Sequence, residues 1–254
     1  RLLNRGDGQT RTMPVAVALS IVADVAYGLA EAWRQGIVHR DVSPTNIQVT
    51  AHGDVKILDF GLARVRGMAQ TTPGQGLKGK WAYLSPEQLE GLPLDGRSDL
   101  FALGSVMYQL LVGQPPFRGS NREETLRKLR DHDFVALDQA ETPEQLIAMP
   151  PADWMPTIGR ADAVRLVHAL LAKLPSERPE DGDAVALRTR DLLGETMADE
   201  RYRHWLAEEV SHAAPVPEVW RGEAAELRGE TVTDPVGENV TNVNIQRRTD
   251  RAVD

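Results

Sequence analysis

The sequence of 254 residues contains no cysteine, and this absence excludes several kinds of chemistry at once. Without thiols the chain can form no disulfide, no thiolate zinc site and no cysteine nucleophile, which is compatible with the cytoplasm. Positive charge is also in the minority, because the net charge is -8 and no predicted helix carries a stripe of lysine or arginine. We therefore expect a cytoplasmic protein that does not bind nucleic acid.

Long uninterrupted apolar runs are missing as well, and no stretch reaches the ~20 apolar residues that a membrane span needs. The closest is 14–30, which follows three arginines as the core of a secretory signal would. Asp24 and Glu31 break that pattern, and the apolar residues recur at helical spacing between Pro14, which suits a first helical turn, and Gly36, which suits a helix end. We predict a buried amphipathic helix rather than a targeting or membrane segment.

The remaining pattern alternates short strands with longer helices. A strand is predicted at 37–38 and a β-hairpin at 47–50 and 55–58, joined by four residues that favour a turn. Periodicity and end signals predict helices at 98–112, 121–131, 160–173 and 180–193. The fold class that follows is mostly α (α+β), a helical lobe with a small hairpin at its mouth.

The composition changes after Gly194. One more amphipathic helix is predicted by the spacing of four apolar residues, Tyr202, Trp205, Leu206 and Val210. Residues 214–254 are polar, of mixed charge and poor in large apolar groups, which predicts disorder. We expect 1–194 to form one lobe, and 195–254 to form an amphipathic helix followed by a disordered tail.

The most informative motif lies at 37–46, where the sequence reads Ile-Val-His-Arg-Asp-Val-Ser-Pro-Thr-Asn. It contains the pattern H-R-D-x-x-x-x-N, and eighteen residues after Asp41 the triplet D-F-G begins at Asp59. Either pattern alone could be a turn or a helix cap, but here a single hairpin joins the two in the right order. The combination resembles the catalytic loop and metal-binding turn of eukaryotic-like (Hanks-type) serine/threonine protein kinases of the bacterial type.

The resemblance implies a protein-kinase-like C-terminal lobe that uses ATP with Mg²⁺ or Mn²⁺. Asp41 would accept the proton of a substrate hydroxyl, while Asn46 and Asp59 would bind the metal and, through it, ATP. His39 would be a structural member of the same loop. Proteins are the implied substrates and partners.

Arg40 precedes the candidate base, and in kinases of this type such an arginine receives a phosphate on the activation segment. The resemblance favours Thr71 and Thr72 as acceptors, since they lie midway between Asp59 and Glu87 and are followed by proline. A phosphate carries about -1.5 to -2 charges and would order the segment through Arg40. The alternative is that both threonines are ordinary loop residues.

Three further signals resemble the structural framework of protein kinases. The stretch 79–87 resembles the end of an activation segment, with Ser85 where alanine is usual before Pro-Glu. Asp99 resembles the residue that holds the catalytic-loop backbone, and Arg178 the late arginine that pairs with Glu87. Removing one partner of a buried pair costs roughly 3 to 5 kcal/mol, so this pair would help determine the fold. The alternative is exposed charges on separate loops.

Two positions depart from the kinase pattern in a reciprocal way. Ser43 stands where a lysine is usual two residues after the catalytic aspartate, and Lys80 stands where a threonine is usual after a glycine. If the charge has moved, Lys80 neutralises the γ-phosphate and Ser43 supplies the hydroxyl, so both are candidate catalytic residues. Lys80 should then lie within direct or water-bridged reach of Asp41, with Ser43 alongside. The other explanation is that the site has decayed.

The stretch 74–80 satisfies both G-x-G-x-x-G and G-x-x-x-x-G-K, the patterns of dinucleotide-binding and phosphate-binding loops. Its context excludes both, because Trp81 follows where a P-loop needs Ser or Thr and no strand precedes the glycines. We interpret the stretch as part of a flexible activation segment.

Residues 1–40 contain no lysine, so the lysine that contacts the α- and β-phosphates in kinases has no counterpart there. We expect the N-terminal lobe to be missing from this chain and to be its partner. Two functions remain open. The chain is either the catalytic lobe of a kinase that phosphorylates Ser/Thr of protein substrates with ATP, or a catalytically silent lobe that acts as a protein-binding or regulatory module through 79–83 or 202–210.

Overall fold

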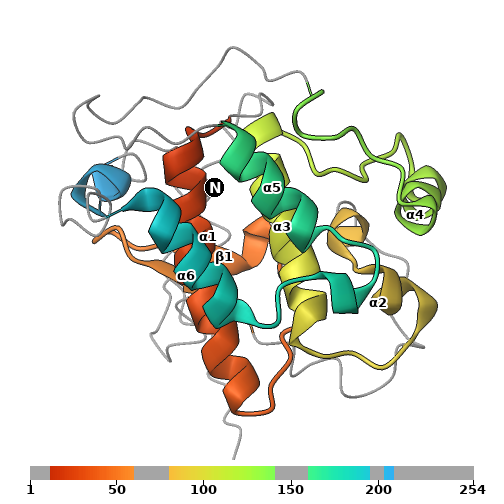
Figure 1. The fold of residues 1–254 in the computed structure, drawn as a ribbon, viewed down its shortest axis with the longest axis horizontal. Helices are drawn as coiled ribbons and strands as arrows, with labels where there is room; N and C mark the ends of the chain where they lie inside the picture. The colour runs from red at the N-terminus through yellow and green to blue at the C-terminus, as the bar shows by residue number, and fades with distance from the viewer. Residues whose placement is uncertain (1–11, 60–79, 141–159, 195–202, 209–254) are drawn as a thin grey trace, which may run out of the picture. The chain divides into compact units, whose positions relative to one another are not determined.

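Four segments of the chain are described by the computed structural model: residues 12–59, 80–140, 160–194 and 203–208 (Figure 1). The chain divides into two units, 1–213 and 214–254, and every described residue belongs to the first. The disorder predicted for 214–254 therefore lies outside the described residues. So do Tyr202 and Val210 of the predicted C-terminal helix.

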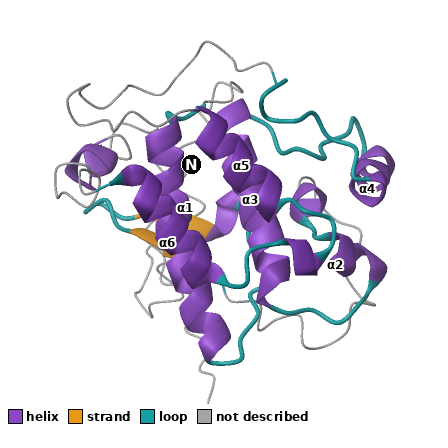
Figure 2. Cartoon of the chain, in the orientation of Figure 1, coloured by secondary structure: helices purple, strands orange, loops and turns teal. Residues whose placement is uncertain are grey.

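The described part is mostly helical with a small antiparallel sheet (Figure 2). Its α-helices are α1 (Val15–Arg34), α2 (Pro86–Glu90), α3 (Gly96–Val112), α4 (Arg122–Asp131), α5 (Arg160–Leu170) and α6 (Gly182–Leu193). The hairpin consists of the strands β1 (Ile47–Val49) and β2 (Val55–Ile57). Short 3₁₀ turns cover Pro44–Asn46, Lys80–Tyr83 and Pro175–Glu177. The predicted fold class, a mostly α lobe with a small hairpin, is confirmed.

Helix α1 begins directly after Pro14, and most of its residues are buried. Within the described ranges α1 is the one helix long and apolar enough to span a membrane, but 72% of its most apolar window is buried inside the lobe. Its packing partners include α3, α6 and β2. The prediction of a buried amphipathic helix is confirmed, because the lobe itself covers the apolar residues of α1.

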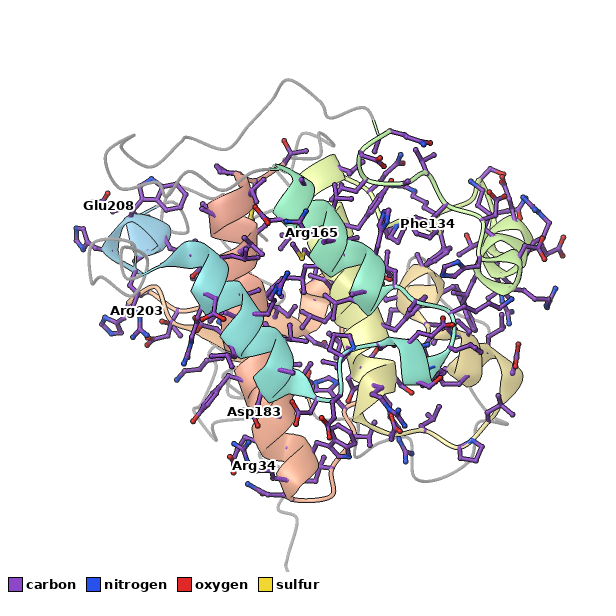
Figure 3. All side chains as sticks on the ribbon, viewed as in Figure 1. Arg34, Phe134, Arg165, Asp183, Arg203 and Glu208 are labelled. Carbon is purple, nitrogen blue, oxygen red and sulfur yellow. The ribbon has the colours of Figure 1, made fainter. Side chains whose placement is uncertain are left out.

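Helix α6 lies along α1 at close range (Figure 3). A Cβ at Gly182 would overlap the carbonyl oxygen of Ala26, so glycine is needed where the first turn of α6 meets α1. Arg34 near the end of α1 also donates from Nη1 to Asp183 Oδ2 of α6 over 2.5 Å. Both of these side chains are half exposed, so we attribute the close packing to the glycine contact rather than to the ion pair.

Helix α3 is the central helix, and nearly all of its residues are buried. It contacts both α1 and α5. Asp95 caps its start by accepting a backbone N–H, and Gly113 ends it with a left-handed φ of 91°. Phe101 of α3 stacks on Phe117 with ring centroids 5.6 Å apart, and both rings are fully buried. The first turn of this well-packed helix carries Asp99, which is therefore held by a rigid element.

The hairpin has the predicted position and pairs Ile47 with Ile57 and Val49 with Val55. The strand predicted at 37–38 was wrong, because these residues form no strand in the described part of the chain. A strand needs a neighbour for its backbone hydrogen bonds, and the two described strands pair only with each other.

A helical turn at 203–208 lies against the turn of the hairpin. The contact is close, because a Cβ at Gly53 would overlap the carbonyl oxygen of Arg203. Trp205 and Leu206 are 8% and 1% exposed and belong to the same hydrophobic core as α1 and α3. The described residues beyond the expected boundary at 194 thus pack with the lobe.

Replacing Gly53 by alanine tests this contact. Gly53 has a φ of 80°, and a left-handed conformation costs a residue with a side chain about 1–2 kcal/mol. Gly36 is a matched control, because its φ is 74° and nothing lies within 4 Å of an added Cβ. We expect Gly53→Ala to lower the free energy of unfolding by about 1–2 kcal/mol more than Gly36→Ala in urea denaturation. Equal losses would mean that 203–208 does not rest on the hairpin turn.

Candidate active site

The motif at 37–46 runs from the end of α1 into β1, beside the end of β2. The amide of Leu58, directly after β2, donates to the carbonyl of Asn46 over 2.8 Å. His39 Nε2 donates to the carbonyl of Leu58 over 2.9 Å. The backbone of Leu58 therefore binds His39 and Asn46, near the two ends of the loop. Asp59 is the next residue in the chain after Leu58.

Asp41 is held by donors from two segments of the chain. Asn46 Nδ2 donates to the carbonyl oxygen of Asp41 over 2.7 Å and to its Oδ2 over 3.1 Å. Lys80 Nζ donates to the same Oδ2 over 2.6 Å. The Asp41 and Lys80 side chains are 25% and 35% exposed, so the pair is partly shielded yet open to a substrate. The predicted contact between Lys80 and Asp41 is present, and the role of Lys80 stays a prediction.

The hydroxyl of Ser43 binds within the loop. Its side chain is buried, and its Oγ is 2.9 Å from Thr45 Oγ1. Within the described segments no hydrogen bond joins Ser43 to Lys80 or to Asp41. The carbonyl of Ser43 accepts the last amide of the 3₁₀ turn Pro44–Asn46 over 3.0 Å. Lys80 therefore contacts the candidate base directly, and the role of Ser43 stays a prediction.

Asp99 binds the backbone just before Asp41. Its Oδ2 accepts the amide of His39 and its Oδ1 the amide of Arg40, both over 2.7 Å. Burial raises the pKa of Asp99 to about 6, although the two amides oppose the shift. Arg40 has a left-handed φ of 66°, a conformation that persists only where the surroundings hold it. The contact predicted between Asp99 and the loop backbone is present.

His39 is fully buried and links the loop to β2. Burial lowers the pKa of His39 below its usual 6.5, so the ring is neutral at pH 7. With its proton on Nε2, which donates to Leu58, Nδ1 accepts the amide of Asp41 over 3.3 Å. This neutral tautomer joins the backbone of Asp41 to the end of β2.

Asn46 and Asp59 have the donor atoms for a divalent cation. Asn46 uses its side-chain nitrogen for Asp41, which leaves its Oδ1 without a partner among the described residues. Asp59 is exposed at a φ of 56°, and no described contact joins its side chain to Asp41 or Asn46. The described segments contain no cluster of three or more His, Asp or Glu side chains, so a bound Mg²⁺ would take its other ligands from phosphates and water. One amide oxygen and one carboxylate fit that chemistry.

The side chain of Arg40 contains an unsatisfied nitrogen. Its Nε is buried, and no hydrogen-bond partner for it exists in the described part of the chain. A buried guanidinium nitrogen in this state is costly, and an anion would satisfy it. The acceptors predicted for the phosphate, Thr71 and Thr72, lie outside the described residues, as do 74–79 of the glycine-rich stretch.

Glu87 and Arg178 form a buried ion pair. Arg178 Nη1 and Nη2 donate to the two carboxylate oxygens over 2.6 and 2.8 Å, and Ser98 Oγ adds a hydrogen bond of 2.7 Å. Arg178 also donates to three backbone carbonyls, those of Ala172, Arg97 and Lys173. Burial raises the pKa of Glu87, but the hydrogen bonds from Arg178 and Ser98 outweigh it, so the pKa lies below its usual 4.5. The predicted pairing is present.

The sequence did not predict two contacts, one made by Trp81, before α2, and one made by Gln88, within α2. Arg122 of α4 stacks over Trp81, 4.0 Å from the ring centroid, and lines an open hollow of about 500 Å³. Gln88 donates to the carbonyl of Arg40 over 2.9 Å. Gln88 has a readable local signal, since Ser85 and Gln88 have the S-x-x-Q spacing of a capping box. No local pattern marks the stacking of Arg122.

These features together define a class of protein. A carboxylate held by an asparagine and a lysine, a following aspartate at the end of a hairpin, and a buried Glu–Arg pair are the framework of a protein kinase C-terminal lobe. Comparison with known families agrees with this geometry. The protein kinase domain family matches residues 2–188, and the chain belongs to that family.

Its relatives are bacterial kinases, as the resemblance predicts. Serine/threonine-protein kinase PknB of Mycobacterium leprae (strain TN) is 34% identical over 225 residues, 77% of this chain and 36% of the relative. The probable serine/threonine-protein kinase PknB of Corynebacterium glutamicum is 36% identical over 177 residues, 66% of this chain and 25% of the relative. Serine/threonine-protein kinase PknL of Mycobacterium tuberculosis is 44% identical over 109 residues, 43% of this chain and 27% of the relative. The chain thus spans about a third or less of the length of these relatives.

Proposed function

We propose that this chain is the catalytic lobe of a serine/threonine protein kinase, which transfers the γ-phosphoryl group of ATP to Ser and Thr hydroxyls of protein substrates. The observation that carries the proposal is the Asp41 carboxylate, held by Asn46 and Lys80 on a loop whose backbone binds Asp99 and His39. The names of the relatives, serine/threonine-protein kinases, support the same activity.

Asp41 is the proposed base. Its carboxylate accepts the proton of the substrate hydroxyl while the hydroxyl oxygen bonds to the γ-phosphorus. The bond from the γ-phosphorus to the bridging oxygen breaks, and ADP leaves with the electron pair. Lys80, 2.6 Å from Asp41 Oδ2, places a positive charge beside the transferred group. Asn46 and Asp59 are the proposed ligands of Mg²⁺ or Mn²⁺, which neutralises phosphate charge when bound.

The proposed activity requires an N-terminal kinase lobe as a partner, because residues 1–40 contain no lysine to contact the α- and β-phosphates. We propose 1–194 as the catalytic lobe and 195–254 as an accessory segment that packs on it through Trp205 and Leu206. The proposed location is the cytoplasm, where ATP is available. With a net charge of -8, nucleic acid is not among the proposed partners.

Transfer of radioactive phosphate by the full-length protein tests the proposal. With ATP and Mg²⁺ we expect labelled phosphoserine and phosphothreonine, without phosphotyrosine, in a general substrate such as casein. EDTA should stop the transfer, because the metal neutralises the phosphates. An Asp41→Asn variant controls for contaminating kinases. Equal label with the wild type and this variant would reject the enzymatic function.

That outcome would favour a second candidate, a catalytically silent lobe that binds other proteins. The direct ion pair of Lys80 with Asp41 is compatible with such a role, because it occupies one oxygen of the carboxylate. The hollow lined by Arg122, next to Trp81, is then the surface to test for a bound protein. Loss of a partner on Arg122→Ala would support this candidate only if the wild type transfers no phosphate.

We also propose that phosphate on Thr71 or Thr72 is the partner of Arg40. A charge-assisted hydrogen bond contributes about 1.5–3 kcal/mol, so phosphorylated protein should be at least about tenfold more active. Mass spectrometry after incubation with ATP should find the phosphate on the peptide that contains both threonines. Arg40→Met should remove the difference between the two forms, since it has no donor. An unmodified peptide in fully active protein would contradict the proposal.

A further inference from the structure

Gln88 joins two parts of the site that are 48 residues apart in the sequence. At the start of α2 the side-chain Oε1 of Gln88 accepts the backbone amide of Ser85 over 2.9 Å. The backbone amide of Gln88 in turn donates to Ser85 Oγ over 3.3 Å. This reciprocal arrangement is a capping box. The remaining polar atom of the side chain, Nε2, donates to the carbonyl oxygen of Arg40 over 2.9 Å. The oxygen of the Gln88 side-chain amide therefore caps α2, and its nitrogen binds the catalytic loop.

The carbonyl of Arg40 belongs to the peptide group that leads into Asp41. A peptide group is planar, so holding its oxygen and its N–H sets the direction in which the Asp41 side chain leaves the backbone. Gln88 holds the oxygen, and His39 Nδ1 holds the N–H over 3.3 Å. The preceding amide, that of Arg40 itself, donates to Asp99 over 2.7 Å.

This peptide needs support because of the left-handed φ of 66° at Arg40. Such a conformation costs a residue with a Cβ about 1–2 kcal/mol and persists only where neighbouring groups hold it. Gln88 is the donor that the described residues provide for this carbonyl oxygen. Without it, the peptide has less to hold it in the orientation that Asp41 requires.

We propose that Gln88 is a positioning residue for Asp41, one that makes the orientation of the base depend on the segment 80–88. Lys80 and Gln88 belong to the same continuous stretch. A displacement of that stretch would break the contact of Lys80 with the Asp41 carboxylate and that of Gln88 with Arg40 together. The catalytic part of this inference rests on the proposed kinase function.

A Gln88→Glu variant separates the two contacts of the side chain. The carboxylate still accepts the amide of Ser85, as glutamate does in capping boxes, but it cannot donate to the carbonyl of Arg40. For the full-length protein we expect kcat to fall about tenfold, the loss of about one hydrogen bond, while the KM for ATP changes less than about twofold. The melting temperature should stay within about 2 °C, because the cap is kept. Gln139→Glu, the same charge change at an exposed residue, is the matched control and should alter none of these values.

Amide hydrogen exchange gives a readout that does not depend on activity. Exchange in a peptide covering 39–46 should become faster in Gln88→Glu and stay unchanged in Gln139→Glu. If the wild type transfers no phosphate and this exchange still becomes faster, the positioning contact is supported and the kinase function fails. Unchanged kcat and unchanged exchange in Gln88→Glu would overturn the inference. Should Gln88→Glu not fold, kcat and the exchange of 39–46 in Gln88→Met, of similar length but without the side-chain amide, decide it, with a lower melting temperature expected from the lost cap.

Discussion

Replacement of Lys80 by alanine is expected to lower the kcat of the full-length protein by about 100- to 1000-fold, as the loss of one transition-state donor does in other enzymes. Lys80 Nζ lies 2.6 Å from Asp41 Oδ2 in a partly shielded pair, so its charge acts at close range on a transferred phosphoryl group. A charge that acts mainly in the transition state changes kcat more than KM. Steady-state kinetics with ATP and a peptide substrate measure both parameters.

Two further variants separate a charge in the site from a charge outside it. Lys128→Ala removes a lysine whose Nζ is 3.9 Å from Glu124 on the same helix, and it should leave kcat within about twofold. Ser43→Lys combined with Lys80→Thr returns the lysine to the position usual in kinases and should restore much of the activity lost in Lys80→Ala. Unchanged kcat in Lys80→Ala would end the hypothesis that the charge has moved from position 43 to Lys80.

Removal of Glu87 is expected to produce the largest loss of stability. Glu87→Ala leaves the Arg178 guanidinium buried without its carboxylate, so the free energy of unfolding should fall by about 3–5 kcal/mol in urea denaturation. Arg178→Met should be at least as damaging, because the carboxylate and three backbone carbonyls then lose a donor.

An exposed ion pair on α4 supplies the control for this prediction. Arg127 and Asp131 are 52% and 50% exposed, and Arg127→Ala should change the free energy of unfolding by less than about 0.5 kcal/mol. If Glu87→Ala lowers the free energy of unfolding no more than Arg127→Ala does, the buried ion pair does not form in solution.

The same pair makes stability depend on pH. The pKa of Glu87 in the folded protein lies below the ordinary 4.5, so its stabilisation is present above pH 4.5 and is lost as the pH falls through the folded pKa. Glu87→Gln has no carboxylate at this position, so its difference from the wild type in unfolding free energy should shrink below pH 4.5. Asp99, whose pKa is raised to about 6, acts in the opposite direction but titrates in both proteins and cancels. A difference that stays constant from about pH 3 to about pH 6 would contradict this.

Local patterns in the sequence determined the helices, the hairpin and the contacts within the catalytic loop. The spacing of apolar residues and the end signals predicted helices such as α4, which Asn121 caps, and the turn residues predicted the hairpin. Asp41 and Asn46 are five residues apart, and the loop itself brings them into contact. Each of these features depends on residues close together in the chain, which is why a sequence pattern contains them.

Tertiary structure alone decided which distant groups reach the loop. Gln88 of α2 approaches Arg40 from 48 residues away, a contact that no sequence pattern marks. Lys80 approaches Asp41 from 39 residues away, a contact that only the family resemblance suggested. The Ser43 hydroxyl lies 2.9 Å from Thr45 Oγ1 in the loop, and its catalytic role stays a prediction.

The errors and omissions at the edges of the lobe have the same cause. Residues 37–38 have the composition of a strand, but none of the described segments places a strand beside them. Trp205 is buried because the chain returns to the hairpin and the core. Local composition sets which conformations and side chains are available to a segment. Its partners are set by packing between segments far apart in the chain, and neither periodicity nor spacing records that information.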